Sequence, residues 1–221
     1  SSDLINEKGE WGGVFFTTPL SAIIVRNKNP EVVKILLEAG ANIEDRDEEG
    51  LTALFYSLWL NQNPEIVAIL IEAGAKINVK NDSGDTPLLR AAVGGDIEVV
   101  NLLLKMGANI NDRNISGDTP LISAAKGNLV RISLGQESRS AILSALINSG
   151  ANINERNNYG ITPLMGAAMS RTKPEILTFL LDSGANAKMK SHNGKTAFDY
   201  AKENDNIKGT PVYWELNTGR F

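Results

Sequence analysis

The sequence predicts an all-α solenoid of helix-turn-helix repeats, because three markers recur along its 221 residues with a shared spacing. A threonine that opens a Thr-Pro or Thr-Ala signature stands at positions 18, 52, 86, 119, 162 and 196. A Gly-Ala pair, which suits the end of a helix, begins at 40, 74, 107, 150 and 184, and a turn glycine stands at 50, 84, 117, 160 and 194. The steps are 33 or 34 residues, with one of 43. This period indicates units that cannot bury their apolar faces alone and therefore stack on one another.

The most regular unit spans residues 81–114, NDSGDTPLLRAAVGGDIEVVNLLLKMGANINDRN. Thr86-Pro87 predicts the start of a first helix, with threonine as the cap and proline at the first helical position. Gly94-Gly95 is expected to end that helix. A second helix with a wide apolar stripe is expected from about Asp96, and Gly107 should terminate it.

A turn, Thr-Pro-Leu and two helices within about 33 residues resemble the ankyrin repeat, and the resemblance covers roughly residues 14 to 217. It implies one all-helical domain over residues 1–221, in which antiparallel helix pairs are joined by short β-hairpin loops that project sideways as fingers. Five full repeats and a C-terminal half repeat are expected, at 14–46, 47–80, 81–113, 114–156, 157–190 and 191–221.

One position departs from the family pattern. Consensus ankyrin repeats have a histidine after Thr-Pro-Leu that ties neighbouring hairpins by hydrogen bonds. In this chain the position holds Ser21, Phe55, Leu89, Ile122, Met165 and Asp199. We therefore expect apolar packing largely to replace this polar tie between repeats.

Composition narrows the range of partners. The net charge is −4 and the pI about 5.2, which disfavours nucleic acid. No apolar run approaches the roughly 20 residues that span a bilayer, so no membrane partner is expected. The chain has no cysteine, which fits the cytoplasm, slightly favoured, as well as an exported or periplasmic protein. It begins with Ser1 rather than Met, which indicates processing or an excised piece.

The N-terminal segment is atypical. Residues 1–13 are polar and Gly-rich, and Trp11-Gly12-Gly13 is expected to form a turn before the first unit. We expect Trp11, Phe15 and Phe16 to close the end of the stack, since a terminal repeat has one face without a neighbour. The alternative is an aromatic patch that binds a partner.

The second unit has Trp59 and Leu60 where the regular units have Val93-Gly94 and Lys126-Gly127. In the ankyrin pattern these positions face the concave groove, and tryptophan is common among residues that dominate binding energy. Alternatively, the extra residue of this 34-residue unit turns Trp59 onto a neighbouring repeat. The sequence leaves both open.

The fourth unit is ten residues longer than the third, and alignment on its helix-ending glycine places the surplus near Leu129–Ser138. A longer loop or an extended first helix is expected, because doubling a loop's length costs only about 0.6 kcal/mol. A separate contact site is the alternative.

No arrangement of residues predicts catalysis, so an enzyme is not expected, and neither is a cofactor or a metal. His192, the only histidine, stands in a predicted turn, and no segment matches a phosphate-binding loop. The acids of 44–49 lack the alternation of a calcium loop. They form either a solvated finger or, with Asp82, Asp85 and Asp118, a surface that steers a basic partner.

The resemblance implies a monomeric protein–protein binding module whose concave surface consists of finger tips and first helices. Carried over residue by residue, the candidate contacts are Glu48, Glu49, Leu51, Trp59, Leu60, Asp82, Ser83, Asp85, Val93, Ile115, Ser116, Asp118, Lys126, Asn158, Tyr159, Ile161 and Met169. This mixture of acids and apolar groups predicts a partner protein with a basic edge and an apolar ridge. The alternatives are a non-catalytic regulatory or targeting domain of a larger enzyme whose catalytic part is absent from this chain, and a structural spacer.

Overall fold

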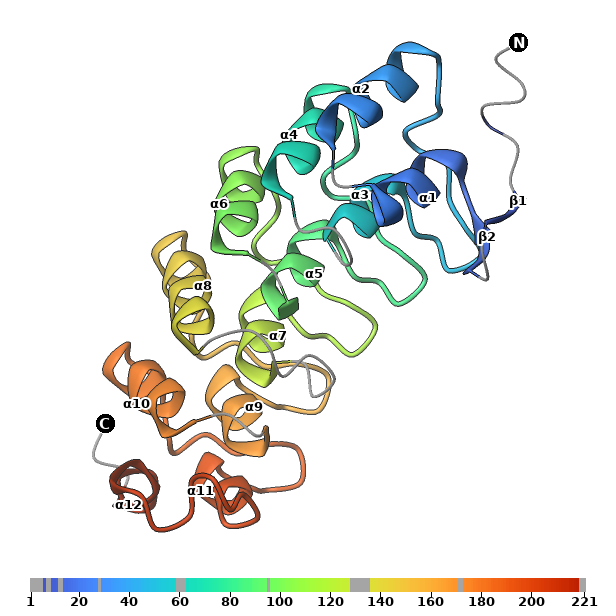
Figure 1. Ribbon diagram of the computed structural model, residues 1–221. Helices are drawn as coiled ribbons and strands as arrows, with labels where there is room; N and C mark the ends of the chain where they lie inside the picture. The colour runs from blue at the N-terminus through green and yellow to red at the C-terminus, as the bar shows by residue number, and fades with distance from the viewer. Residues whose placement is uncertain are drawn as a thin grey trace.

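Two parallel rows of helices form a curved stack in the computed structural model (Figure 1). The structure describes residues 6, 9–11, 14–27, 29–58, 63–94, 96–127, 136–170 and 173–218, with only the backbone of 9–11, 14–17, 136 and 137. Each repeat adds one helix to each row, and each helix packs on its counterpart in the next repeat. The predicted all-α repeat solenoid is confirmed.

The first helices of the repeats make the inner row. They are α1 Pro19–Arg26, α3 Ala53–Tyr56, α5 Pro87–Gly94, α7 Pro120–Lys126, α9 Pro163–Met169 and α11 Ala197–Ala201. The second helices make the outer row: α2 Pro30–Glu38, α4 Pro64–Glu72, α6 Ile97–Lys105, α8 Gln136–Asn148, α10 Pro174–Asp182 and α12 Pro211–Thr218. Among the described residues, none of these helices has the length and apolar character that a membrane span requires.

Local capping explains where the helices begin and end. In the third repeat the Thr86 hydroxyl accepts a hydrogen bond from the Leu89 amide, as predicted for the start of α5. Asp96 caps α6 by accepting from the Glu98 amide, and Gly107 ends α6 with φ of 88°. Gly94 still belongs to α5, while Gly95 lies outside the described residues.

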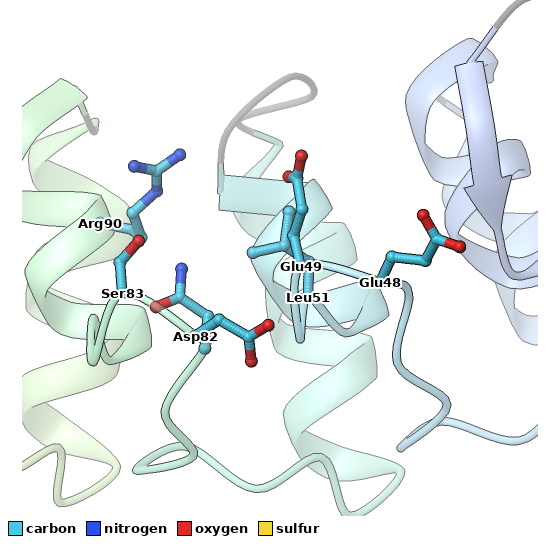
Figure 2. Close-up of a pocket in the computed structure, with 7 residues that line it drawn as sticks. Glu48, Glu49, Leu51, Asp82, Ser83 and Arg90 are labelled. Carbon is cyan, nitrogen blue, oxygen red and sulfur yellow. The ribbon is translucent and has the colours of Figure 1, made fainter.

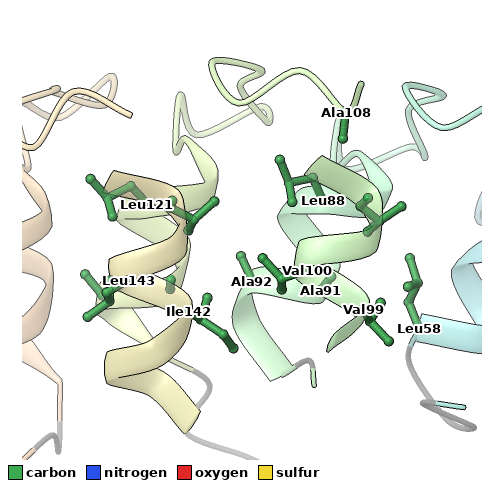
Figure 3. Close-up of a cluster of buried hydrophobic side chains, with 14 of the residues drawn as sticks. Leu58, Leu88, Ala91, Ala92, Val99, Val100, Ala108, Leu121, Ile142 and Leu143 are labelled. Atoms are coloured by element: carbon green, nitrogen blue, oxygen red, sulfur yellow. The ribbon is translucent and has the colours of Figure 1, made fainter. Parts of the chain in front are cut away.

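One apolar core extends from Leu20 in α1 to Leu216 in α12. Figure 3 shows the part of it around α5 to α8. Leu88, Val100, Leu121 and Leu143 are completely buried between the two rows. Each such leucine contributes about 1.5–3 kcal/mol relative to an exposed side chain. Buried alanine pairs in the inner helices allow neighbouring repeats to approach closely. These pairs are Ala91-Ala92, Ala124-Ala125 and Ala167-Ala168.

The fingers are joined by one backbone hydrogen bond at each step along the stack. The amides of Asp82, Ile115, Asn158 and His192 donate to the carbonyls of Glu49, Ser83, Ser116 and Tyr159 in the preceding finger, at 3.2, 3.1, 3.1 and 3.0 Å. The finger tips are therefore held in a continuous row, which fixes their order and spacing.

A second ladder uses basic side chains at the finger bases. Arg46, Lys80, Arg113 and Arg156 each donate to the backbone carbonyl of the corresponding residue in the next repeat, Lys80, Arg113, Arg156 and Lys190, at 3.0, 3.0, 2.8 and 2.6 Å. Asparagines add further ties: Asn78 bonds to the Asn109 amide, and Asn154 to the Asn186 amide. At the position of the consensus histidine, Phe55, Leu89, Ile122 and Met165 are buried and apolar, so apolar packing largely replaces that tie as expected. The ties described above join the repeats at other positions.

The N-terminal segment forms an antiparallel hairpin of β1 Gly9–Trp11 and β2 Val14–Thr17, which the sequence did not predict. Its register pairs Gly9 with Thr17 and Trp11 with Val14, with an irregularity between. Asn6 accepts from the Asn42 amide and donates to the Gly40 carbonyl, as Asn154 does for the fifth repeat. Asn6 thus gives the first repeat a polar tie. The side chains of Trp11, Phe15 and Phe16 lie outside the described residues, so their capping role stays a prediction.

The lengthened fourth repeat extends its second helix. α8 has 13 residues, whereas α2, α4, α6 and α10 each have 9, so four of the ten extra residues belong to α8. The alternative of an extended first helix is wrong, because α7 ends at Lys126. Residues 128–135, which hold most of the predicted Leu129–Ser138 insertion, lie outside the described part of the chain.

Candidate partner-binding groove

Each of the first four fingers is shaped by an Asp or Asn at its start and a glycine near its tip, and the fifth starts with Ser191 instead. Asp47 accepts hydrogen bonds from the amides of Glu49 and Leu51 at 2.9 and 2.8 Å, and Asn157 does the same for Tyr159 and Ile161 at 2.9 Å. The glycine that follows the tip adopts φ between 73° and 75° in every finger, a conformation that suits glycine. The two tip residues between them are left pointing away from the turn.

The candidate residues at the tips are exposed. Glu48, Glu49, Asp82, Ser83 and Asn158 are open to solvent. Asp85, Val93, Ser116 and Lys126 are half-buried. Trp59 and Leu60 lie outside the described residues, so their place in the groove stays a prediction.

Three candidates turn inward and support the groove from below. Leu51 and Ile161 are only 4% and 6% exposed, since the residue after the turn glycine packs into the core. Asp118, at 7%, accepts from Lys126 Nζ at 2.6 and 2.8 Å and from Asn157 Nδ2 at 2.7 Å. We omit these three side chains from the surface offered to a partner.

The middle of the groove is neutralised by pairs within the chain. Asp118 forms the ion pair with Lys126, and Asp85 lies 3.7 Å from Arg90 while accepting from Asn114 Nδ2 at 3.0 Å. In both cases a basic residue of an inner helix meets the acid that ends a finger. Neither acid is left to attract an external cation.

A hollow of about 250 Å³ lies between the first two fingers and α5 (Figure 2). It is lined by Glu48, Glu49, Leu51, Asn81, Asp82, Ser83 and Arg90. Five of these residues were candidate contacts from the sequence (Glu48, Glu49, Leu51, Asp82 and Ser83), whereas Asn81 and Arg90 were missed. The repeat pattern could have identified Arg90, because it precedes the candidate Val93 by three residues, about one turn of the same inner helix.

A hydrogen bond to Tyr56 supports the floor of the first finger. The Tyr56 hydroxyl donates to Asp47 Oδ2 at 2.5 Å, while Oδ1 of the same carboxylate holds the turn. Burial raises the pKa of Tyr56 well above its usual value, and the bond to Asp47 adds to this. The hydroxyl therefore stays protonated as a donor throughout the physiological range.

The apolar part of the groove lies farther along the stack. Ile115, Tyr159 and Met169 are 70%, 60% and 51% exposed. Ile115 and Tyr159 are on adjacent fingers, which the Asn158 side chain ties together by donating to the Ile115 carbonyl at 3.0 Å. Met169 ends α9, the inner helix that follows the Tyr159 finger.

Among the described residues, no group of three or more His, Cys, Asp or Glu side chains is placed to hold a metal ion. In comparison with known families, a family model for ankyrin repeats in three copies matches residues 3–81, 60–137 and 132–210. No curated protein matches the sequence significantly.

Proposed function

The chain belongs to the ankyrin-repeat family, whose repeats are generally protein–protein interaction modules, and on that premise we propose that it binds a partner protein in the groove. The contact surface would consist of the exposed finger tips and the ends of the inner helices. Trp59 and Leu60, which lie outside the described residues, are included in this proposal only because of their place in the sequence repeat.

The observation that carries this proposal is the position of the exposed apolar side chains. In the described part of the chain, the large apolar side chains with high exposure are Ile35, Met106, Ile115, Tyr159, Met169 and Trp214. Half of them, Ile115, Tyr159 and Met169, coincide with groove positions predicted from the repeat. Clustered exposed apolar residues mark surfaces that another molecule covers, whereas scattered ones are ordinary.

The other three exposed apolar side chains are scattered, which supports binding by a monomer. Ile35 lies on α2, Met106 follows α6 and Trp214 lies on α12, so these three belong to different repeats. Light scattering of the purified chain would show one protomer if this part of the proposal holds.

Site-specific photo-cross-linking tests the groove. A photoreactive amino acid is placed at Tyr159 in one protein and at Ile35 in a matched control, which is equally exposed at 61% but lies on the outer row. After irradiation in a lysate of the source cells, the Tyr159 probe should form a discrete adduct with a protein that the Ile35 probe does not capture. Identical adducts from both probes, or none from Tyr159, would contradict the proposal.

A further inference from the structure

The groove has two chemically different ends, and this difference deepens the proposed function by specifying its ligand. We propose that the partner enters as an extended segment with an arginine or lysine side chain in the hollow between the first two fingers and an apolar side chain against Ile115, Tyr159 and Met169. The inference rests on the proposed function, because it assumes that the groove is the binding surface.

The apolar end provides the area that the segment would cover. Ile115 and Tyr159 extend from neighbouring fingers, and Met169 is exposed at the end of α9. A flexible methionine and a rigid aromatic ring on the same groove suit an apolar side chain of variable shape. Covering these groups removes apolar surface from water, which favours association.

The charged residues elsewhere in the groove indicate the charge of the second side chain that the partner segment should carry. Glu48, Glu49 and Asp82 line the hollow and form no ion pair within the described residues. Asp85 and Asp118, farther along, are already paired with Arg90 and Lys126. Uncompensated negative charge on the groove is therefore concentrated at the first two fingers. A basic side chain there meets three carboxylates, and the charge of Arg90, which also lines the hollow, is offset by Asp85 at 3.7 Å; an acidic side chain meets repulsion.

The hollow is smaller than a pocket that encloses a small-molecule ligand. Its volume of about 250 Å³ is below the ~300–1,000 Å³ of pockets that enclose small-molecule ligands. Leu51 also lines the hollow but is only 4% exposed, so the charged end of a lysine or arginine would mainly meet Glu48, Glu49 and Asp82.

The spacing between the two ends sets the length of the segment. The hollow lies between the first and second fingers, and the apolar residues lie on the third and fourth, so the two centres are two repeats apart. Packed helices are roughly 8–10 Å apart, so two repeats cover about 18 Å. An extended chain rises about 3.3 Å per residue, so the basic and apolar residues of the partner should be about five or six positions apart.

The test is selection from a random library of 12-residue peptides displayed on phage, with the purified chain as target. Enriched peptides should share an arginine or lysine placed about five or six residues from a large apolar residue. Enrichment of acidic peptides, or of basic residues without this spacing, would overturn the proposal.

The affinity of an enriched peptide is then measured for four variants of the chain, to determine where on the surface the peptide binds. Glu49→Gln with Asp82→Asn, and separately Tyr159→Ala, should each weaken binding by roughly tenfold or more. Glu65→Gln with Glu98→Gln removes the same two charges from exposed positions on the outer row, and Ile35→Ala removes an exposed apolar side chain there. These two controls should change the affinity less than about twofold. Circular dichroism of every variant checks that the fold is kept.

The outcomes separate this inference from the proposed function. Loss with Tyr159→Ala but not with Glu49→Gln and Asp82→Asn would keep the groove and overturn the basic side chain. Peptides unaffected by either groove variant, or no enrichment at all, would overturn both. Self-association that Tyr159→Ala abolishes would show that a second copy occupies the groove, which also overturns the inference.

Discussion

At the scale of single residues, Gly127 shows how closely the backbone is constrained at the edge of the groove. It ends α7 with φ of 63° and ψ of 177°, a region that is nearly exclusive to glycine, and a Cβ there would collide with the Arg139 guanidinium. Gly127→Ala should lower the free energy of unfolding by about 1–3 kcal/mol. Gly94 occupies the equivalent position in α5 and has space for a Cβ. Gly94→Ala should therefore raise the free energy of unfolding by about 0.5–1 kcal/mol. Urea denaturation measures both, and equal effects would contradict this explanation.

Tyr56 gives a prediction for alkaline pH. Its folded pKa lies above the unfolded value of about 10, so it contributes stability that is complete below pH 10 and declines as pH rises above it. Tyr56→Phe removes the bond to Asp47 and should cost about 1–3 kcal/mol at pH 7. The difference in the free energy of unfolding between the unmodified chain and Tyr56→Phe should decrease from pH 10 to 11 in denaturation experiments. A constant difference would show that the phenol does not titrate as described.

At the scale of elements, α11 depends on its cap. Thr196 and Asp199 bond to each other's backbone amides, and Lys202 Nζ lies 2.8 Å from Asp199. The bond from Lys202, followed by those from Thr196, holds the pKa of Asp199 well below its usual range.

Asp199→Asn should therefore destabilise the protein by about 1 kcal/mol at pH 7. A lowered folded pKa gives stability that is present above the unfolded pKa of about 4 and is lost as pH falls below it. The difference in the free energy of unfolding between Asp199→Asn and the unmodified chain, measured by denaturation, should therefore become smaller below pH 4. Asp205→Asn, at an exposed position soon after α11, serves as the control and should have little effect at any pH.

The elements also show how far the sequence could predict the structure. Helix starts were predictable because Thr-Pro combines a cap with a fixed φ, which is decided locally. The β1–β2 hairpin was not, since pairing of two short strands depends on what lies beside them rather than on local preference. The extension of α8 was missed because counting from Gly150 locates a surplus but does not assign it to a helix or a loop.

The groove was predictable as a set of positions but not as a surface. The repeat assigned Glu49 and Leu51 to one finger, but only the folded turn shows that Glu49 faces water while Leu51 is buried. The pairing of Asp118 with Lys126 was also hidden, because it joins two candidates that had been treated as independent. Side-chain direction and mutual neutralisation both arise from tertiary structure.

At the scale of the whole molecule, two kinds of contact join the repeats. One is the apolar core, and the other is the ladder of basic side chains at the finger bases. Arg113 donates to the carbonyls of Gly117 and Arg156 and pairs with Glu155. Arg113→Met should lower the free energy of unfolding by about 1–3 kcal/mol, since it leaves carbonyls without their donor.

Lys190 is the matched control for this ladder. It is the last rung, and its side chain makes no hydrogen bond or ion pair with the described residues, so Lys190→Met should stay within about 0.5 kcal/mol of the unmodified chain. Urea denaturation measures both variants. Equal losses would mean that the ladder does not hold the repeats together.

The central claim is that the concave side of the stack binds a protein, and hydrogen–deuterium exchange of the complex with the cross-linked partner tests it most directly. If the partner lies on the concave side, exchange should be slower in the fingers, at residues 47–51, 81–85, 114–118 and 157–161, and unchanged in α2, α4, α6 and α10. Protection confined to the outer helices, with the fingers unchanged, would contradict it.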